Sequence, residues 1–187
     1  MKPISTREQI VEVADELFYQ QGFEHTSFAH VAEVVGISRG NFYYHFKTKD
    51  EILLAVITLR LQRTRNMLQQ WESEADAPAD RIRSFINILI MNAAKIKQYG
   101  CPVGTLCSEL AKLDHVSKKE ANKVFSLFRV WLKKQFAQLG HDQQADALAI
   151  HLLVQSQGIA TLASAFHDEK LIRREVKRLN DWLVPYT

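Results

Sequence analysis

Residues 35–46 read Val-Gly-Ile-Ser-Arg-Gly-Asn-Phe-Tyr-Tyr-His-Phe. Gly36 suits a bend and Ser38 suits the cap of a helix over 39–46, because glycine tolerates left-handed backbone angles and serine accepts a free N–H. The preceding segment places apolar residues at helical spacing, namely Phe28, Val31, Ala32 and Val35. Two short helices joined by a tight glycine turn have the form of a helix-turn-helix. The second helix of such a pair enters a major groove, so this stretch predicts a DNA-reading unit.

The predicted second helix carries groups that suit contacts with phosphates and base edges. These groups belong to Ser38, Arg39, Gly40, Asn41, Tyr43, Tyr44 and His45. Asn41 suits the two-bond reading of an adenine and Arg39 that of a guanine, while Gly40 allows close approach of the backbone. Lys47 and Lys49 lie near the start of the next helix, where free N–H groups also favour a phosphate.

The aromatic residues of this helix allow a second interpretation. Phe42 and Phe46 are four positions apart and are assigned to the core. Tyr43, Tyr44 and His45 are consecutive, so some of them must be exposed. On spacing alone, an aromatic cluster of this kind is equally consistent with the core of a small helical domain that binds nothing.

Helix signals continue on both sides of this motif. Ser5 or Thr6 caps a first helix that Gly22 ends, and Thr26 or Ser27 caps the first helix of the motif. A capping box from Thr48 to Glu51 opens a long helix that reaches about Trp71, followed by a loop over 73–80. Further helices are expected over about 80–98, 104–113, 117–139, 142–166 and 168–184.

Composition agrees with a helical protein. The 187 residues are 47% hydrophobic and 24% charged, with seven glycines and four prolines. Few helix breakers and this apolar content favour an all-α fold and exclude a disordered chain. The sequence shows no run of ~20 apolar residues, so we expect no transmembrane helix. The N-terminal residues lack the features of a signal peptide, so we expect a cytoplasmic protein.

The first quarter of the chain resembles a known family. The run Arg7-x-x-Ile10-x-x-x-Ala14-x-x-Leu17-Phe18-x-x-x-Gly22-Phe23-x-x-Thr26-Ser27, then Val31-Ala32-x-x-x-Gly36 through Phe46, then Lys49-Asp50-Glu51-Ile52-Leu53, is similar to the DNA-binding domain of tetracycline-repressor (TetR) regulators. The resemblance implies an all-helical homodimer that binds a palindromic double-stranded operator, represses nearby genes and releases DNA when a small-molecule effector binds.

The resemblance also assigns roles to individual residues. It implies phosphate contacts for Thr26 and Ser27 and for Lys49 at the start of the fourth helix. It places Arg39, Gly40 and Asn41 nearest the bases. The remaining positions of the recognition helix, implied to contact the DNA backbone, are Tyr43, Tyr44 and His45. Val31 and Phe42 stand where the family more often has Ile and Leu, which alters packing and not chemistry.

The expected architecture is an all-α fold of about nine helices in two domains. Residues 1–48 form a three-helix helix-turn-helix domain that binds DNA, and residues 49–187 form a larger helical domain for effector binding and dimerisation. Residues 158–165 carry small side chains that permit close helix approach, so the two C-terminal helices are expected to form the dimer interface. Internal packing is the alternative use of these small residues.

A ligand site is expected among the central helices, where Met and aromatic residues exceed what a thin bundle needs. The candidate ligand-binding residues are Met67, Trp71, Phe85, Met91, Cys101, Cys107, Phe128, Trp131 and His151. Cys101 precedes Pro102 at a helix start, a position that favours a reactive thiolate, whereas free cysteine is more commonly a small buried hydrophobe. The effector is therefore expected to be hydrophobic or electrophilic.

Two other function classes compete with a DNA-binding regulator. One is a thiol-dependent catalyst that uses Cys101 with His115 or His151, for which no complete nucleophile, base and orienting group occurs in the sequence. The other is a helical partner-binding module without DNA binding. No enzyme activity, cofactor or metal is expected. Salt-dependent binding to duplex DNA distinguishes the regulator from both alternatives.

Overall fold

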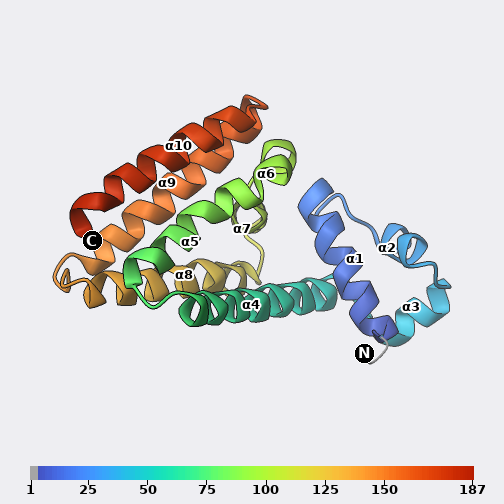
Figure 1. The fold of residues 1–187 in the computed structure, drawn as a ribbon. Helices are drawn as coiled ribbons and strands as arrows, with labels where there is room; N and C mark the ends of the chain where they lie inside the picture. The colour runs from blue at the N-terminus through green and yellow to red at the C-terminus, as the bar shows by residue number, and fades with distance from the viewer. Residues whose placement is uncertain (1–3) are drawn as a thin grey trace. The chain divides into compact units, whose positions relative to one another are not determined.

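The computed structural model describes residues 4–187, and within this range the chain is α-helical with no β-strand (Figure 1). This confirms the predicted all-α fold. The helices are α1 (Thr6–Gln21), α2 (Phe28–Val35), α3 (Arg39–His45), α4 (Lys49–Glu74), α5 (Pro78–Met91), α6 (Ala93–Tyr99), α7 (Pro102–Lys112), α8 (Lys118–Gln138), α9 (Ala145–Ala165) and α10 (Glu169–Leu183). A short 3-10 helix, η1 (Val184–Tyr186), follows α10.

The chain divides into two compact units. The first unit comprises the chain up to Arg63 together with Thr105–Lys123, and the second comprises Thr64–Gly104 and Val124–Thr187. The helices α4, α7 and α8 each pass from one unit to the other. The predicted functional boundary after residue 48 stays a prediction, because compactness alone does not assign function.

Serine caps start the first three helices, as the sequence predicts. Ser5 caps α1 and forms a capping box in which its N–H donates to Glu8 Oε2 (2.8 Å) and the Glu8 N–H donates to its Oγ (3.3 Å). The Ser5 N–H and the Ser5 hydroxyl both donate to the Glu8 carboxylate, and these two hydrogen bonds hold the pKa of Glu8 below its ordinary value. Ser27 caps α2 and Ser38 caps α3, each accepting the N–H of the residue three positions later. The choices left open at Ser5 or Thr6 and at Thr26 or Ser27 thus resolve to the serines.

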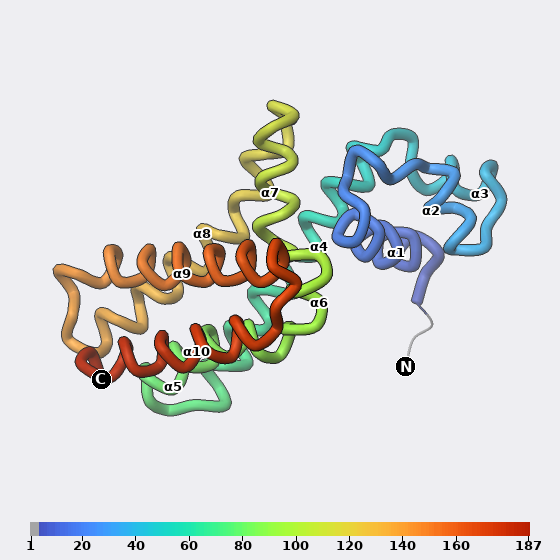
Figure 2. The backbone as a smooth tube through the Cα atoms, turned by 90° about the horizontal axis from the view of Figure 1, so that it is seen from above, coloured from blue at the N-terminus to red at the C-terminus, as the bar shows by residue number. Residues whose placement is uncertain are grey.

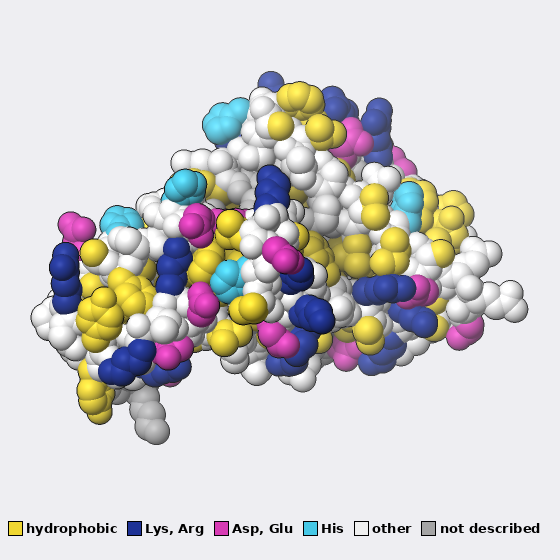
Figure 3. Space-filling view, turned by 180° about the vertical axis from the view of Figure 1, so that it is seen from behind, with side chains coloured by type: hydrophobic (Ala, Val, Ile, Leu, Met, Phe, Trp, Pro, Cys, Tyr) yellow, Lys and Arg dark blue, Asp and Glu magenta, His cyan; other side chains and the backbone are white. Residues whose placement is uncertain are grey.

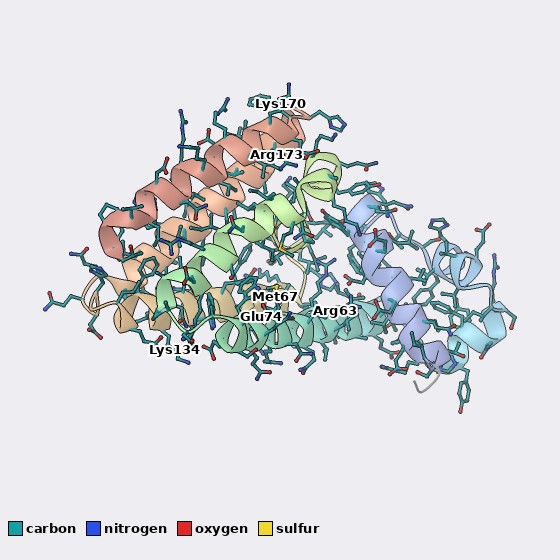
Figure 4. All side chains as sticks on the ribbon, viewed as in Figure 1. Arg63, Met67, Glu74, Lys134, Lys170 and Arg173 are labelled. Atoms are coloured by element: carbon teal, nitrogen blue, oxygen red, sulfur yellow. The ribbon has the colours of Figure 1, made fainter. Side chains whose placement is uncertain are left out.

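Ion pairs fix the first part of α4 to α1 in the first unit. Arg60 Nε lies 2.6 Å from Asp15 Oδ1, and Arg63 reaches both Asp15 Oδ2 (3.2 Å) and Glu12 Oε1 (2.5 Å). The side chains of Arg60 and Asp15 are 10% and 17% exposed, so their attraction is less screened than that of a surface pair. Residues 49–63 are therefore held with α1 as part of one body (Figure 4 labels Arg63).

Two boundaries in the middle of the chain differ from the predicted ones. The helix α4 continues to Glu74, and Pro78 opens α5, so the expected loop over 73–80 shortens to residues 75–77. The helix expected over 80–98 is present as α5 and α6 with a break at Asn92. The Asn92 amide donates to the Ile88 carbonyl (2.9 Å), and asparagine commonly competes with the helix backbone in this way.

The second unit buries its core among α5, α8, α9 and α10. Helix α10 contacts α5 and α9, and Figures 1 and 2 show α9 and α10 side by side. Its fully buried residues include Ile82, Ile86, Leu132, Phe136, Ala149, Leu152, Ala160 and Ile172. By length and composition, α9 also meets the criterion for a membrane-crossing helix, although 44% of its most apolar window is buried in the protein. The sequence predicted a helix over 142–166 here, but not an apolar run of this length.

Candidate nucleic-acid interface

The turn between α2 and α3 sets the direction of the recognition helix. Gly36 has φ +75° and ψ 32°, left-handed angles that strain a residue with a side chain. Its N–H donates to the carbonyls of Ala32 and Glu33 (both 3.0 Å), which ends α2. The rings of Phe28 and Phe42 lie 5.1 Å apart and hold α2 against α3. The turn and this ring contact thus come from residues within the motif itself.

Helix α3 presents an exposed polar surface. Arg39, Gly40 and Asn41 are exposed in its first turn. A Cβ at Gly40 would meet no described atom within 4 Å, so packing within the protein does not require glycine there. Glycine in a helix costs ~1 kcal/mol relative to alanine. The residue therefore fits a role that needs close approach from outside, as a major-groove contact does.

The aromatic residues of α3 separate into core and surface, as predicted. Phe42 and Phe46 are each 1% exposed, and the Arg7 guanidinium lies 4.6 Å from the Phe46 ring centre. Tyr43 is 47% exposed and packs its ring edge-on against Phe28 at 5.7 Å. Tyr44 is 79% exposed, with its ring against His45 at 5.2 Å, and His45 is half-buried. Two tyrosines therefore remain available to a partner.

The residues assigned to phosphate contacts differ in availability. Ser27 is exposed, and its Oγ accepts the His30 N–H (3.1 Å) as the α2 cap. Thr26 is 1% exposed; its hydroxyl donates to the Gly22 carbonyl (2.7 Å) and its N–H to the Phe23 carbonyl (3.2 Å). The assignment of Thr26 to a phosphate contact is corrected here, because both of its donors are used inside the fold. Its hydroxyl instead closes the turn after α1.

Lys49 is half-buried and has internal partners. Its Nζ donates to the Glu24 carbonyl (2.9 Å) and lies 4.3 Å from the centre of the Phe23 ring. The neighbouring Lys47 is exposed, and its Nζ donates to the Tyr43 carbonyl. Lys49 therefore braces the turn before α2, a role that the sequence does not indicate, and its remaining N–H groups are the ones that could meet a phosphate.

Three acidic residues of α1 have partners within the protein. The carboxylates of Glu12 and Asp15 are paired with Arg60 and Arg63 of α4, and Glu8 is used in its own helix cap. These acids lie on α1, whereas Arg39 opens α3. The carboxylates of Glu12 and Asp15 are thus balanced by arginines of α4, which lies outside the α2–α3 motif.

Four of the predicted ligand residues form two buried aromatic pairs. Trp71 and Trp131 pack at 5.6 Å and Phe85 and Phe128 at 5.5 Å, all four buried in the second unit as core. Met67 on α4 is half-buried (Figure 4), and Cys107 is buried in α7.

Two further ligand candidates lie at the surface or in aromatic packing. Met91 is 79% exposed, so its assignment to a pocket interior is wrong; the break at Asn92 follows it directly. His151 is half-buried and stacks on Trp182 at 4.5 Å. The ligand site as a whole stays a prediction, carried by Cys101 and the remaining buried residues.

Cys101 lies where α7 begins. It is half-buried, and its Sγ accepts the Gly104 N–H and the Gln157 side-chain N–H, both at 3.5 Å. A Cβ on Gly104 would clash with Gln157 Oε1, so a larger residue there would have to move the flexible Gln157 side chain. The Gln157 side chain is therefore a direct neighbour of the Cys101 thiol.

Two residues of the first unit that lie far along the chain contact its N-terminal segments, and sequence reasoning missed these contacts. Glu109 accepts two backbone N–H groups of the turn after α1, and His115 contacts Phe23 and Asp50. Glu109 lies 85 and 86 residues from its partners, so the sequence carries no local signal for these contacts.

On the surface shown in Figure 3, charged side chains alternate with separate hydrophobic patches.

Comparison with known protein families gives two matches. Residues 10–56 match the family described as bacterial regulatory proteins, tetR family. Residues 78–177 match the family described as transcriptional regulator LmrA/YxaF-like, C-terminal domain. The second match alone covers more than half of the chain.

Individual relatives are also transcriptional regulators. An HTH-type regulator from the lacX 3′ region of Lactococcus lactis is 31% identical over 124 residues, which span 65% of this chain and 63% of that relative. The regulator YxaF of Bacillus subtilis is 27% identical over 143 residues, 74% of each chain. QacR of Staphylococcus aureus is 31% identical over 71 residues, 38% of this chain and 36% of QacR.

Solved structures share the fold. A TetR transcriptional regulator from Legionella pneumophila aligns with a TM-score of 0.86 at 24% identity, covering 97% of this chain and 98% of that one. A TetR regulator from Chloroflexus aurantiacus aligns at 0.82 with 20% identity, covering 96% and 94%.

Proposed function

Because the chain belongs to the tetR family of bacterial regulatory proteins, with a C-terminal domain of the LmrA/YxaF-like type, we propose that it is a ligand-responsive repressor. It binds a palindromic operator as a homodimer and releases it when a small effector binds. The family is one of transcriptional regulators and not of enzymes, which sets aside the thiol catalyst. TetR regulators are soluble DNA-binding proteins, and the cytoplasm is the location proposed here.

The observation that carries this proposal is the exposed first turn of α3. Arg39, Gly40 and Asn41 lie there on a helix whose other side is anchored by Phe42 and Phe46. Rigid anchoring of the helix with free reading groups is what base recognition requires. The proposed interface comprises Ser27, Ser38, Arg39, Gly40, Asn41, Tyr43, Tyr44, His45 and Lys49.

Binding to duplex DNA tests the proposal directly. We expect the protein to select palindromic duplexes from a random-sequence library. The logarithm of its affinity for a selected duplex should fall linearly with the logarithm of salt concentration, and the slope should be about −0.9 for each phosphate contacted. A duplex with scrambled half-sites is the control for non-specific binding. Failure to enrich any duplex, or an affinity independent of salt, would reject the DNA-binding function.

The homodimer proposal rests on the outer face of α9. Residues 147–166 contain no Asp, Glu, Lys or Arg, and this stretch includes exposed side chains along the whole helix. Its large exposed apolar residues are Ile150, Val154, Leu162 and Phe166. An apolar helix face of this length is characteristic of a protein interface. A second copy satisfies it by the two-fold packing of identical faces.

Gly158 at the middle of this face supports the same partner. The residue is exposed, and a Cβ there would meet no atom of the described chain within 4 Å. Glycine inside a helix costs ~1 kcal/mol relative to alanine, and no contact within one copy accounts for that cost. Close approach by α9 of another copy does account for it. Helix α10 contributes less, because its apolar residues are buried within its own unit and its outer face carries ion pairs.

Release of DNA follows from geometry in this proposal. Two recognition helices must reach half-sites about one turn of DNA apart or a multiple of it. The α1–α4 ion pairs make residues up to Arg63 move with the recognition helix. An effector that binds more tightly when the two recognition helices have a different spacing therefore weakens operator binding. The size of the effect is set by the difference in the effector's affinity for the two arrangements.

The proposed effector is hydrophobic or electrophilic, and Cys101 provides the test of the electrophilic class. N-ethylmaleimide adds to a thiol by forming an S–C bond, with the thiol proton transferred to the adjacent ring carbon. We expect Cys101 to be modified ahead of buried Cys107 and the affinity for the selected duplex to fall, because the adduct removes the hydrogen bond between Cys101 at the start of α7 and Gln157 of α9. Mass spectrometry and duplex titration measure the two effects.

Cysteine-to-serine variants control this experiment. Cys101→Ser should keep duplex affinity and become insensitive to the reagent, whereas Cys107→Ser should respond like the unmodified sequence. If the Cys101 adduct forms and duplex affinity does not change, the electrophilic class is excluded and the hydrophobic class remains.

A further inference from the structure

Phe23 is the meeting point of several segments of the first unit. It is 3% exposed, and its ring packs edge-on against Phe18 at 5.3 Å and His115 at 5.2 Å. The Lys49 ammonium lies 4.3 Å from the ring centre. The Phe23 side chain, in the turn that leads to α2, thus contacts three segments: the end of α1, the start of α4 and the turn between α7 and α8.

Glu109 of α7 holds the backbone of this turn with both carboxylate oxygens. The Phe23 N–H donates to Oε2 (2.9 Å), and the Glu24 N–H donates to Oε1 (2.8 Å). Charge-assisted hydrogen bonds of this kind are about twice as strong as neutral ones. Gly22 fits this contact, because its φ is +89° and a Cβ there would lie 3.0 Å from Glu109 Oε1.

The same corner holds the start of α4. The Lys49 Nζ donates to the Glu24 carbonyl (2.9 Å), the residue whose N–H Glu109 accepts. His115 Nδ1 accepts the Ser117 N–H (3.1 Å), which leaves Nε2 to donate to Asp50 Oδ1 (3.3 Å). The corner between α7 and α8 therefore contacts both segments that flank the α2–α3 motif along the chain.

We infer that Glu109 is a positioning residue for DNA recognition. Its carboxylate holds the turn before α2 in the orientation that α3 needs to read DNA, so that any displacement of α7 reaches the reading helices through these two hydrogen bonds. The inference rests on the proposed DNA-binding function. It assigns to Glu109 a role beyond stability, since only the fraction of molecules with a correctly oriented motif binds DNA.

Variants of Glu109 test this role against a matched control. Glu109→Ala removes both acceptors, whereas Glu109→Gln keeps the size of the side chain and a single acceptor oxygen. Glu120→Ala is the control, because Glu120 is a glutamate of the same unit whose described contact is an exposed pair with Lys123 (2.6 Å). For each protein we would measure amide hydrogen exchange at Phe23 and Glu24, and affinity for the selected and the scrambled duplex.

We expect Glu109→Ala to lose exchange protection at both amides and to bind the selected duplex about 10-fold more weakly, with little change for the scrambled duplex. Glu109→Gln should retain protection at one amide and give an intermediate affinity. Glu120→Ala should match the unmodified protein in both measurements.

The outcomes separate the inference from the proposed function. If the unmodified protein binds the selected duplex and Glu109→Ala binds it equally well, the inference is wrong even where exchange or unfolding temperature changes. Unchanged exchange at Phe23 and Glu24 also overturns it, because the two hydrogen bonds would then not hold the turn. An unmodified protein that binds no duplex would instead overturn the proposed function.

Discussion

The double variant Arg39→Ala, Asn41→Ala is expected to bind the selected duplex about 100-fold more weakly than the unmodified protein, or weaker still. Each base-reading side chain contributes ~1–3 kcal/mol of discrimination, and these two are the reading candidates in the exposed first turn of α3. Binding to a scrambled duplex should fall less, because only the charge of Arg39 is lost there. Titration of both duplexes at one salt concentration measures the difference.

The fold should survive this double substitution. Arg39 and Asn41 are exposed, and the N–H that Asn41 donates to Ser38 is a backbone group that alanine retains. Alanine also favours a helix more than asparagine does. The matched control is Arg65→Ala, Asn66→Ala, which removes an exposed Arg and Asn from α4. Equal loss of affinity in both variants, or no loss in the first, would show that α3 does not read the duplex.

Val154→Glu is expected to convert a dimer into a monomer. Two-fold packing of α9 would bury two copies of the new carboxylate in an apolar interface, and each unpaired buried charge costs several kcal/mol. The dissociation constant of the dimer should rise about 1,000-fold or more. Sedimentation measured over a range of protein concentrations gives this constant.

Two comparisons make the dimer result specific to α9. Val130→Glu introduces the same charge at an exposed valine of α8, 67% exposed against 60% for Val154, and should leave the oligomeric state unchanged. Gly158→Leu should block association. It should leave each copy folded, since no described atom lies within 4 Å of the added Cβ. A Val154→Glu protein that remains dimeric would place the interface elsewhere.

Loss of the dimer should also weaken operator binding. A monomer presents one recognition helix and therefore reaches one half-site, so the gain from binding two linked sites disappears. The two predictions can be told apart, because the α3 variant should stay dimeric, whereas the α9 variant should keep its reading surface and lose affinity through dissociation.

Much of the DNA-reading unit was predictable because its signals are local. Ser5, Ser27 and Ser38 start helices by accepting N–H groups three positions away, and Gly36 ends α2 with left-handed angles. Helical spacing also placed Phe42 and Phe46 in the core, whereas it predicted only that some of Tyr43, Tyr44 and His45 are exposed.

Other assignments failed because residue type alone gives neither the exposure of a side chain nor its hydrogen-bond partner. Thr26 has the residue type of a phosphate contact, yet its hydroxyl closes the turn at Gly22. Met91 has the residue type of a pocket lining, yet it lies exposed at the end of α5. The break at Asn92 did have a local signal, since asparagine competes with the helix backbone, but helical periodicity outweighed it in the sequence reading.

By itself the sequence determined the all-α fold, most of the helices, the Ser38 cap and the resemblance to the family, since each of these signals depends on residues within a few positions of one another. Only the tertiary structure decided that Lys49 donates to the turn before α2, that Glu109 accepts two N–H groups of that turn, and that a Cβ at Gly158 would meet no described atom within 4 Å. The physical reason is that a hydrogen bond or a buried face needs two surfaces, and helical periodicity specifies one of them while the packing of remote segments supplies the other.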